Sequence, residues 1–223
     1  MDSNGRVEPF AVMDCALASL AVGRRAQSLR ELKTQIREVH PDSLYHHFWG
    51  TLLRPRFSDR EYNNDFASWA RHSLHDNRLA ERLAVIDPTD YPDLEALRGE
   101  LVDVIDERLD ESETVPGAPV DHMFYFLRSI VVVFDTHVRI EHPRELGAAV
   151  GTMSTGSVFY HFIDARCRTA RSLDDFRAWL ECWGGEFDDL RMKLAGIDPY
   201  FDALPALRQR LSRLINDCAG GAS

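Results

Sequence analysis

The feature that most constrains this chain is an internal repeat that runs through most of its 223 residues. Tyr45–Phe48 (Tyr-His-His-Phe) aligns with Phe159–Phe162 (Phe-Tyr-His-Phe) at an offset of 114 positions, since 161 − 47 = 114. Further along, Asp65–Trp69 aligns with Asp175–Trp179 as Asp-Phe-x-x-Trp, at an offset of 110, since 175 − 65 = 110. The matches keep one order along the chain, so we predict two copies of a unit of about 110 residues.

The repeat also predicts the domain organisation. We expect a first helical unit at residues 1–110, a linker at 111–120, a second helical unit at 121–217 and a disordered tail at 218–223. The linker is assigned because Glu-Ser-Glu-Thr-Val-Pro-Gly-Ala-Pro-Val contains two prolines, one glycine and no apolar periodicity. A chain of this length can bury a core in each of two small domains.

Helical patterns dominate both units. The leucines and isoleucine of Leu94–Ile105 recur at i, i+3 and i+4 spacing, and Leu204–Ile215 repeats that stripe. Ser28 followed three residues later by Glu31 is a capping box, which predicts a helix that ends at about Val39. The predicted fold class is therefore mainly α, with two tandem helical units.

The opening segment of each unit gives conflicting signals. Phe124–Phe134 is rich in aromatic and β-branched residues, which favour a strand. Its counterpart, Met13–Leu20, is rich in alanine and leucine, which favour a helix. We therefore allow for a small strand or hairpin at the start of each unit, within a fold that is otherwise helical.

Composition and charge narrow the classes of partner. The formal net charge is −10, and an acidic chain without a concentrated basic face argues against nucleic acid as a partner. The most apolar stretch, Ile130–Phe134, is too short to span a bilayer, so no membrane partner is expected. The four cysteines form no C-x-x-C pair, which indicates reduced thiols and a cytoplasmic location.

Two histidine–aspartate pairs are the first candidates for a polar site. His47 precedes Asp65 by 65 − 47 = 18 residues, and His161 precedes Asp175 by 175 − 161 = 14 residues. An aspartate can hold a catalytic imidazole in one tautomer, and the two groups together can begin a metal site. In the structural interpretation, each aspartate caps the next helix and the histidine fastens that turn. We favour the structural interpretation and predict no bound metal.

Aromatic residues follow the two aspartates. Phe66 and Trp69 lie three residues apart on one predicted helix face, as do Phe176 and Trp179. They could line a ligand pocket or form the core of each unit. We favour the core, because aromatic pairs at this spacing are usually buried.

These patterns together resemble an uncharacterised prokaryotic family of helical domains, catalogued only as a domain of unknown function. The resemblance rests on Tyr-x-His-Phe, then Asn-Asp-Phe-x-x-Trp from Asn64, then a Leu-Ala-x-x-Leu-Ala-x-Ile-Asp-Pro turn and a Leu-Arg helix. It is strong for residues 43–109 and weaker for 157–217, where Asp174 stands in place of Asn64. The resemblance implies a helical fold and supplies no reaction, cofactor or catalytic residue.

The sequence therefore favours a non-enzymatic interaction or regulatory protein, with another protein as partner and no cofactor. A homo-oligomer is compatible with the repeat. Two alternatives stay open: a metal-binding or His/Asp-based enzyme that uses the two histidine–aspartate pairs, and a small-molecule-sensing module with an aromatic pocket. We found no nucleophile–base pair, glycine-rich phosphate loop or metal-ligand cluster in the sequence, and this motivates the order of preference.

Overall fold

The structure is a computed structural model, and it describes residues 7–53, 61–111, 117–169, 171–199 and 202–219. Of the described residues, 59% are helical and 17% lie in strands. It divides into two compact units. The α1–α5 unit comprises residues 17–130, and the α6–α11 unit comprises residues 1–16 together with 131–223. Each unit is described by itself.

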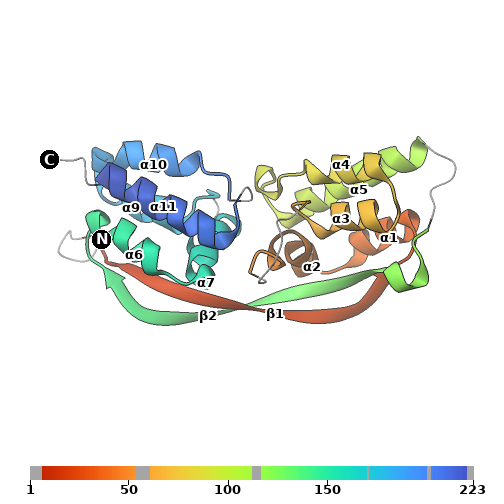
Figure 1. Cartoon of the computed structure of the whole chain (residues 1–223), viewed down its shortest axis with the longest axis horizontal. Helices are drawn as coiled ribbons and strands as arrows, with labels where there is room; N and C mark the ends of the chain where they lie inside the picture. Colours follow the sequence, from red (N-terminus) through yellow and green to blue (C-terminus); the bar gives the residue numbers. More distant parts are fainter. Residues whose placement is uncertain (1–6, 54–60, 112–116, 170, 200–201, 220–223) are drawn as a thin grey trace. The chain divides into compact units, whose positions relative to one another are not determined.

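The two strands correct the predicted fold class. β1 (Phe10–Ala26) and β2 (Phe124–Ile140) have 17 residues each and pair as one two-stranded antiparallel sheet (Figure 1). The expectation of a mainly α fold, with at most a small strand or hairpin opening each unit, is wrong. Met13–Leu20 lies inside β1, because pairing with the aromatic and β-branched β2 outweighs the weak helix propensity of alanine and leucine.

Each strand contains one residue with positive φ. Gly23 has a φ of 73° and His137 a φ of 63°, and the predicted repeat aligns these positions, since 137 − 23 = 114. Glycine adopts this conformation without steric cost, whereas a histidine there is unusual. Asp135 stabilises this conformation of His137, because its carboxylate accepts a hydrogen bond from the His137 backbone N–H at 2.7 Å. Such residues are typical of β-bulges, which bend and twist a strand.

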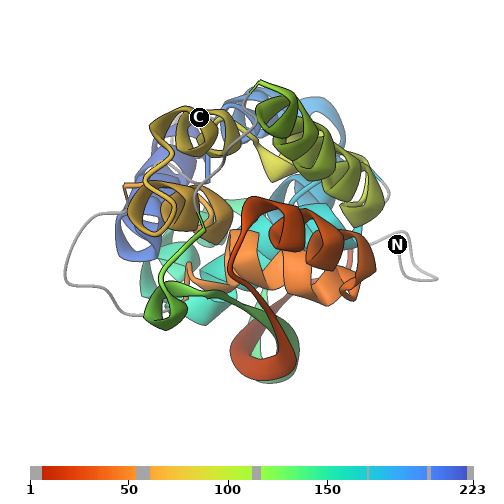
Figure 2. The same ribbon diagram turned by 90° about the vertical axis from the view of Figure 1, so that its right-hand side faces the viewer.

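In the α1–α5 unit, the helices lie on one side of the strand ends (Figures 1 and 2). Its helical elements are α1 (Leu29–Glu38), α2 (Pro41–Tyr45), the π-helix η1 (His46–Gly50), α3 (Asp65–His72), α4 (Asn77–Ala84), the 3₁₀-helix η2 (Pro88–Asp90), α5 (Leu94–Asp110) and the 3₁₀-helix η3 (Val120–His122). The predicted capping box is confirmed, because Ser28 accepts from the Glu31 N–H at the start of α1. The predicted apolar stripe of α5 is also confirmed, with Leu97, Leu101 and Ile105 fully buried.

The α6–α11 unit contains a comparable set of helices. They are α6 (Pro143–Thr152), α7 (Thr155–Val158), the π-helix η4 (Phe159–Asp164), α8 (Ala165–Arg168), α9 (Asp175–Glu181), the 3₁₀-helix η5 (Gly184–Phe187), α10 (Asp188–Ala195) and α11 (Leu204–Ala219). α11 packs directly on α6, and a Cβ on Gly147 would overlap Asn216. The Ser212 hydroxyl donates to the Gly147 carbonyl at 2.7 Å across this contact.

Parts of the predicted linker and tail lie outside the residues that the structure describes. Residues 112–116 of the predicted linker and 220–223 of the predicted tail lie outside the described residues, and α11 continues to Ala219. Among the described helices, none combines the length and the apolar character needed to cross a membrane.

Candidate functional site

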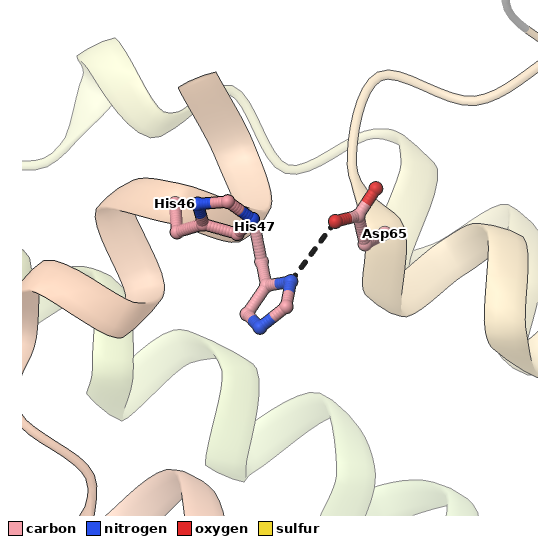
Figure 3. Close-up of side chains that lie close together, drawn as sticks. All are labelled: His46, His47 and Asp65. Atoms are coloured by element: carbon pink, nitrogen blue, oxygen red, sulfur yellow. Dashed lines mark hydrogen bonds and ion pairs between the residues drawn. The ribbon is translucent and has the colours of Figure 1, made fainter. Parts of the chain in front are cut away.

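His47 is held by hydrogen bonds at both ring nitrogens. It lies on η1, and its side chain is 3% exposed. Nδ1 is 2.9 Å from Oδ2 of Asp65, the first residue of α3 (Figure 3). Nε2 accepts from the Leu127 backbone N–H at 3.2 Å. A backbone N–H can only donate, so the proton of the neutral imidazole sits on Nδ1 and is donated to Asp65.

Ser43 completes this arrangement from one helical turn earlier. Its hydroxyl donates to the Leu127 carbonyl at 2.7 Å, and its side chain is fully buried. Ser43 and His47 therefore satisfy both the carbonyl and the N–H of a single β2 residue. A strand edge would otherwise leave those groups unpaired, which is costly when they are buried.

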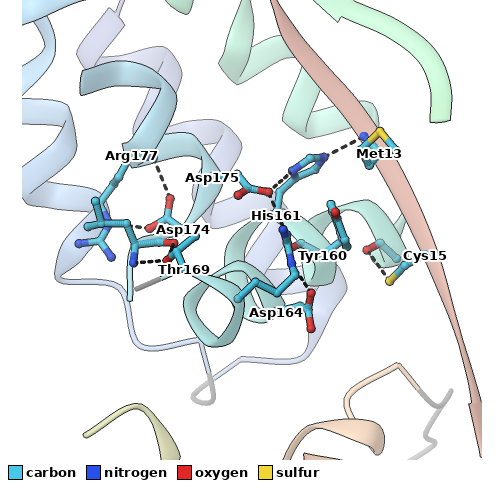
Figure 4. Close-up of polar contacts among 12 residues, drawn as sticks. Met13, Cys15, Tyr160, His161, Asp164, Thr169, Asp174, Asp175 and Arg177 are labelled. Carbon is cyan, nitrogen blue, oxygen red and sulfur yellow. Dashed lines mark hydrogen bonds and ion pairs between the residues drawn. The ribbon is translucent and has the colours of Figure 1, made fainter. Parts of the chain in front are cut away.

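The α6–α11 unit contains the matching histidine contacts at the positions that the predicted repeat aligns. His161 lies on η4, with Nδ1 2.8 Å from Asp175 Oδ2 and Nε2 accepting from the Met13 backbone N–H at 2.9 Å (Figure 4). Asp175 also accepts from Arg168 at 3.1 Å. The structure thus brings each predicted histidine to its predicted aspartate, within its own unit.

The geometry around His47 bears on metal binding. Ligand atoms of His46, His47 and Asp65 all lie within 4.8 Å of one another, which is compact enough for a metal ion. A metal ion needs an unprotonated nitrogen with a free lone pair. In this structure Nδ1 of His47 carries the proton and Nε2 already accepts from Leu127. His46 Nδ1, for its part, lies 2.8 Å from the Ser129 hydroxyl. In this tautomer His47 cannot ligate a metal without releasing β2.

An arginine organises the charges beside His161. Arg168 bonds to Asp164 at 2.6 Å and to Asp175 at 3.1 Å, and its guanidinium lies 3.9 Å from the centre of the Tyr160 ring. Burial disfavours its charge, but Asp175 and then Asp164 outweigh burial and raise the pKa of Arg168. Burial also raises the pKa of Tyr160. The guanidinium therefore stays charged and the phenol stays protonated, which excludes both as bases near neutral pH.

The buried cysteine of β1 lacks the character of a nucleophile. The Cys15 thiol is 3.4 Å from the Gly156 carbonyl. Burial, followed by the nearby charge of Asp164, raises the pKa of Cys15 to about 12. A thiol that stays protonated at neutral pH is inert in substitution chemistry.

The aromatic candidates lie in the cores of their units. Phe66 and Phe176 are fully buried. The indole N–H groups of Trp69 and Trp179 each bind the segment that leads into a strand. Trp69 Nε1 donates to the His122 carbonyl at 2.8 Å, and Trp179 Nε1 donates to the Glu8 carbonyl at 2.8 Å. These indoles therefore fasten strand to helix, as the two histidines do.

Trp179 additionally lines a cavity of about 320 Å³ in the α6–α11 unit. The wall comes from the chain that enters β1, from η4 and from α9. Its lining residues are Val7, Glu8, Pro9, Phe10, Ala11, Met13, Tyr160, His161, Asp175, Trp179 and Cys182. Of the four predicted aromatic candidates, Trp179 is the one among these lining residues.

The capping role of two motif residues, Asn64 and Asp174, was missed in the sequence analysis. The helices α3 and α9 are capped by Asn64 and Asp174, one residue before the aspartates expected to cap them. The Asn and Asp preceding the Asp-Phe-x-x-Trp motif were an available signal, because both are preferred capping residues. The bonds to Leu127 and Met13 left no such signal, because a backbone N–H is present at almost every position.

Comparison with known proteins places the chain in a family. No curated protein matches the chain. A solved structure of OrfY from Thermoproteus tenax is similar to it, with 27% sequence identity, a TM-score of 0.82 and coverage of 96% of each chain. A model of a family of unknown function, DUF5752, matches residues 7–216. This agrees with the resemblance to an uncharacterised family, and the chain belongs to DUF5752.

Proposed function

We propose that this is a non-enzymatic protein that binds another protein through an exposed apolar stretch of β2. The observation that carries the proposal is the exposure of four large apolar side chains within the α6–α11 unit. Val132 is 51% exposed, Val133 39%, Phe134 48% and Val138 50%. Single exposed apolar residues are ordinary, whereas several exposed apolar residues along one short stretch are typical of an interaction surface.

The arrangement along the strand strengthens this inference. Successive strand residues point to opposite faces, so Val132 and Phe134 share one face and Val133 lies on the other. Both faces of β2 are therefore exposed here, although Ile140 at its end is buried. The run Ser129–Phe134 contains no charged residue. Sheet edges that stay in water are usually protected by charges, which makes an uncharged, apolar run better suited to a covered surface.

The polar candidates support a non-enzymatic role. His47 and His161 use both ring nitrogens to hold strand and helix. A general base needs a free lone pair directed at a substrate proton. The thiol of Cys15 is held protonated by its raised pKa. The groups that first suggested chemistry are thus already engaged in holding the fold.

The test compares protein capture by two matched variants. Val132→Thr with Phe134→Thr keeps strand-favouring residues but removes apolar surface. Val85→Thr is the control, because Val85 is 81% exposed at the end of α4 in the other unit. Each protein serves as bait in an extract of the native cell, with quantitative mass spectrometry of what is captured.

The expected result is a partner captured in equal amounts by the wild type and the Val85→Thr control. The double variant should retain less than about one tenth of that partner, because interface centres contribute most of the binding free energy. Equal capture by the double variant, or no stoichiometric partner together with turnover of a metabolite, would contradict the proposal.

A further inference from the structure

A second site is carried by the cavity of the α6–α11 unit. We infer that this cavity binds a small organic cation, an ammonium group joined to a short apolar or aromatic body. The inference is independent of the β2 surface, because it rests on different residues. The cavity volume of about 320 Å³ lies at the small end of the range for ligand pockets.

The charges around the cavity favour a cation. Glu8 and Asp175 both line it, and neither lysine nor arginine is among the lining residues. His161 is neutral, since Nε2 accepts from Met13 and Nδ1 donates to Asp175. The guanidinium of Arg168 lies over the ring of the lining residue Tyr160 and is shared between Asp164 and Asp175. Two lining residues are thus acidic and none is basic, and Asp164 outside the lining shares the charge of Arg168, so the cavity wall keeps a negative potential that favours an ammonium group.

The uncharged lining suits an apolar body. Phe10 and Trp179 contribute aromatic rings whose centres lie 5.5 Å apart. The indole N–H of Trp179 is already donated to the Glu8 carbonyl, so the ring offers only its apolar surface. Tyr160 adds a phenol from η4 (Figure 4). Aromatic surfaces beside carboxylates attract organic cations through dispersion, cation–π attraction and charge.

The positions aligned by the predicted repeat differ in the α1–α5 unit. Glu8 aligns with His122 and Ala11 with Tyr125, because 122 − 8 and 125 − 11 both equal 114. Glu8 and Ala11 are therefore particular to the α6–α11 unit, whereas Asp175 has the counterpart Asp65. We expect the site to belong to that unit alone.

Three probes of nearly equal shape test the inference by calorimetry on the full chain. 2-Phenylethylammonium carries the positive charge, 2-phenylethanol is neutral, and 3-phenylpropionate is negative. The ammonium probe should bind at least about ten-fold more tightly than either of the others. Equal affinity of the three probes, tighter binding of the carboxylate, or no binding of the ammonium probe at about 10 mM would overturn the inference.

A pair of charge reversals locates the site. Glu8→Lys places a cation in the cavity wall, and Glu141→Lys makes the same change at an exposed position outside the lining. The structure uses Glu8 through its backbone carbonyl, so the fold should tolerate the substitution. Glu8→Lys should lower the affinity for the ammonium probe by about ten-fold or more, whereas Glu141→Lys should leave that affinity nearly unchanged. Equal effects of the two variants would show non-specific attraction to an acidic protein and overturn the site.

Discussion

The imidazole Nε2 of His47 accepts a hydrogen bond from the backbone N–H of Leu127, 80 residues further along the chain. In the α6–α11 unit, Nε2 of His161 accepts in the same way from Met13. A helix thereby supplies, through one side chain, the partner that a third strand would supply through its backbone. This relationship gives the repeated His-Phe pair, His47-Phe48 and His161-Phe162, a physical role that depends on an unprotonated Nε2.

Replacement of His47 tests this role. His47→Ala leaves the Leu127 N–H and the Asp65 carboxylate without their partner, so we expect a loss of about 1–3 kcal/mol in the free energy of unfolding. Urea denaturation followed by circular dichroism measures it. His72→Ala is the control, because that side chain is 57% exposed and should change stability by less than about 0.5 kcal/mol. An unchanged unfolding free energy, together with loss of a metal found by elemental analysis, would favour a functional histidine.

Asn64 and Asp174 cap α3 and α9 in different environments. The Asn64 amide donates to the Leu83 carbonyl at 2.8 Å in the buried interior. Asn64→Asp would place a carboxylate oxygen against that carbonyl, and we expect it to destabilise by about 3 kcal/mol or more. Asn64→Ser is the control, since it keeps a capping oxygen without introducing a charge. Equal stability of Asn64→Asp and the serine variant would contradict a stabilising contact between the Asn64 amide and the Leu83 carbonyl.

The raised pKa of Asp174 predicts that the stability of the protein depends on pH. Burial raises the pKa of Asp174 above its ordinary value of 3.8, although Arg177 and Arg166 act in the opposite direction. The folded state then binds more protons than the unfolded state between the ordinary and the raised pKa, so this group lowers stability as pH rises through that window.

The measurement compares the wild type with Asp174→Asn in urea at a series of pH values from about 3.5 to 7. The wild-type unfolding free energy minus that of the variant should fall as pH rises through the window above 3.8, and then stay constant. Other titrating groups cancel in this difference. A difference that grows with pH would mean that the arginines control the titration of Asp174.

Gly50 makes room for the His46 ring. A Cβ at this position would lie 2.8 Å from His46 Nδ1 and 2.9 Å from the Ser129 hydroxyl, which are hydrogen-bonded to each other. Gly50→Ala should therefore destabilise by about 1–3 kcal/mol through overpacking. Gly99→Ala in α5 is the matched control, because open space surrounds its Cβ position, and it should stabilise by about 0.5–1 kcal/mol. Thermal unfolding of both variants checks the opposite signs.

Several elements could be predicted because their signals are local. The Ser28 cap, the apolar stripe of α5 and the burial of Phe66 follow from residues within one or two helical turns. The contact between His47 and Asp65 was within reach because the two residues recur in order in both halves of the sequence. The resemblance to an uncharacterised family is confirmed by the family model over residues 7–216.

The strands are the opposite case. Met13–Leu20 has a composition that favours helix, and its pairing with β2 depends on residues more than 100 positions away. The 148-residue separation between Met13 and His161 joins the start of the chain to the helices of the α6–α11 unit. Local residue patterns therefore set the helices and their caps. The assignment of each strand end to a set of helices came only from the folded chain, because backbone hydrogen bonds are the same for almost every residue and only three-dimensional proximity selects their partners.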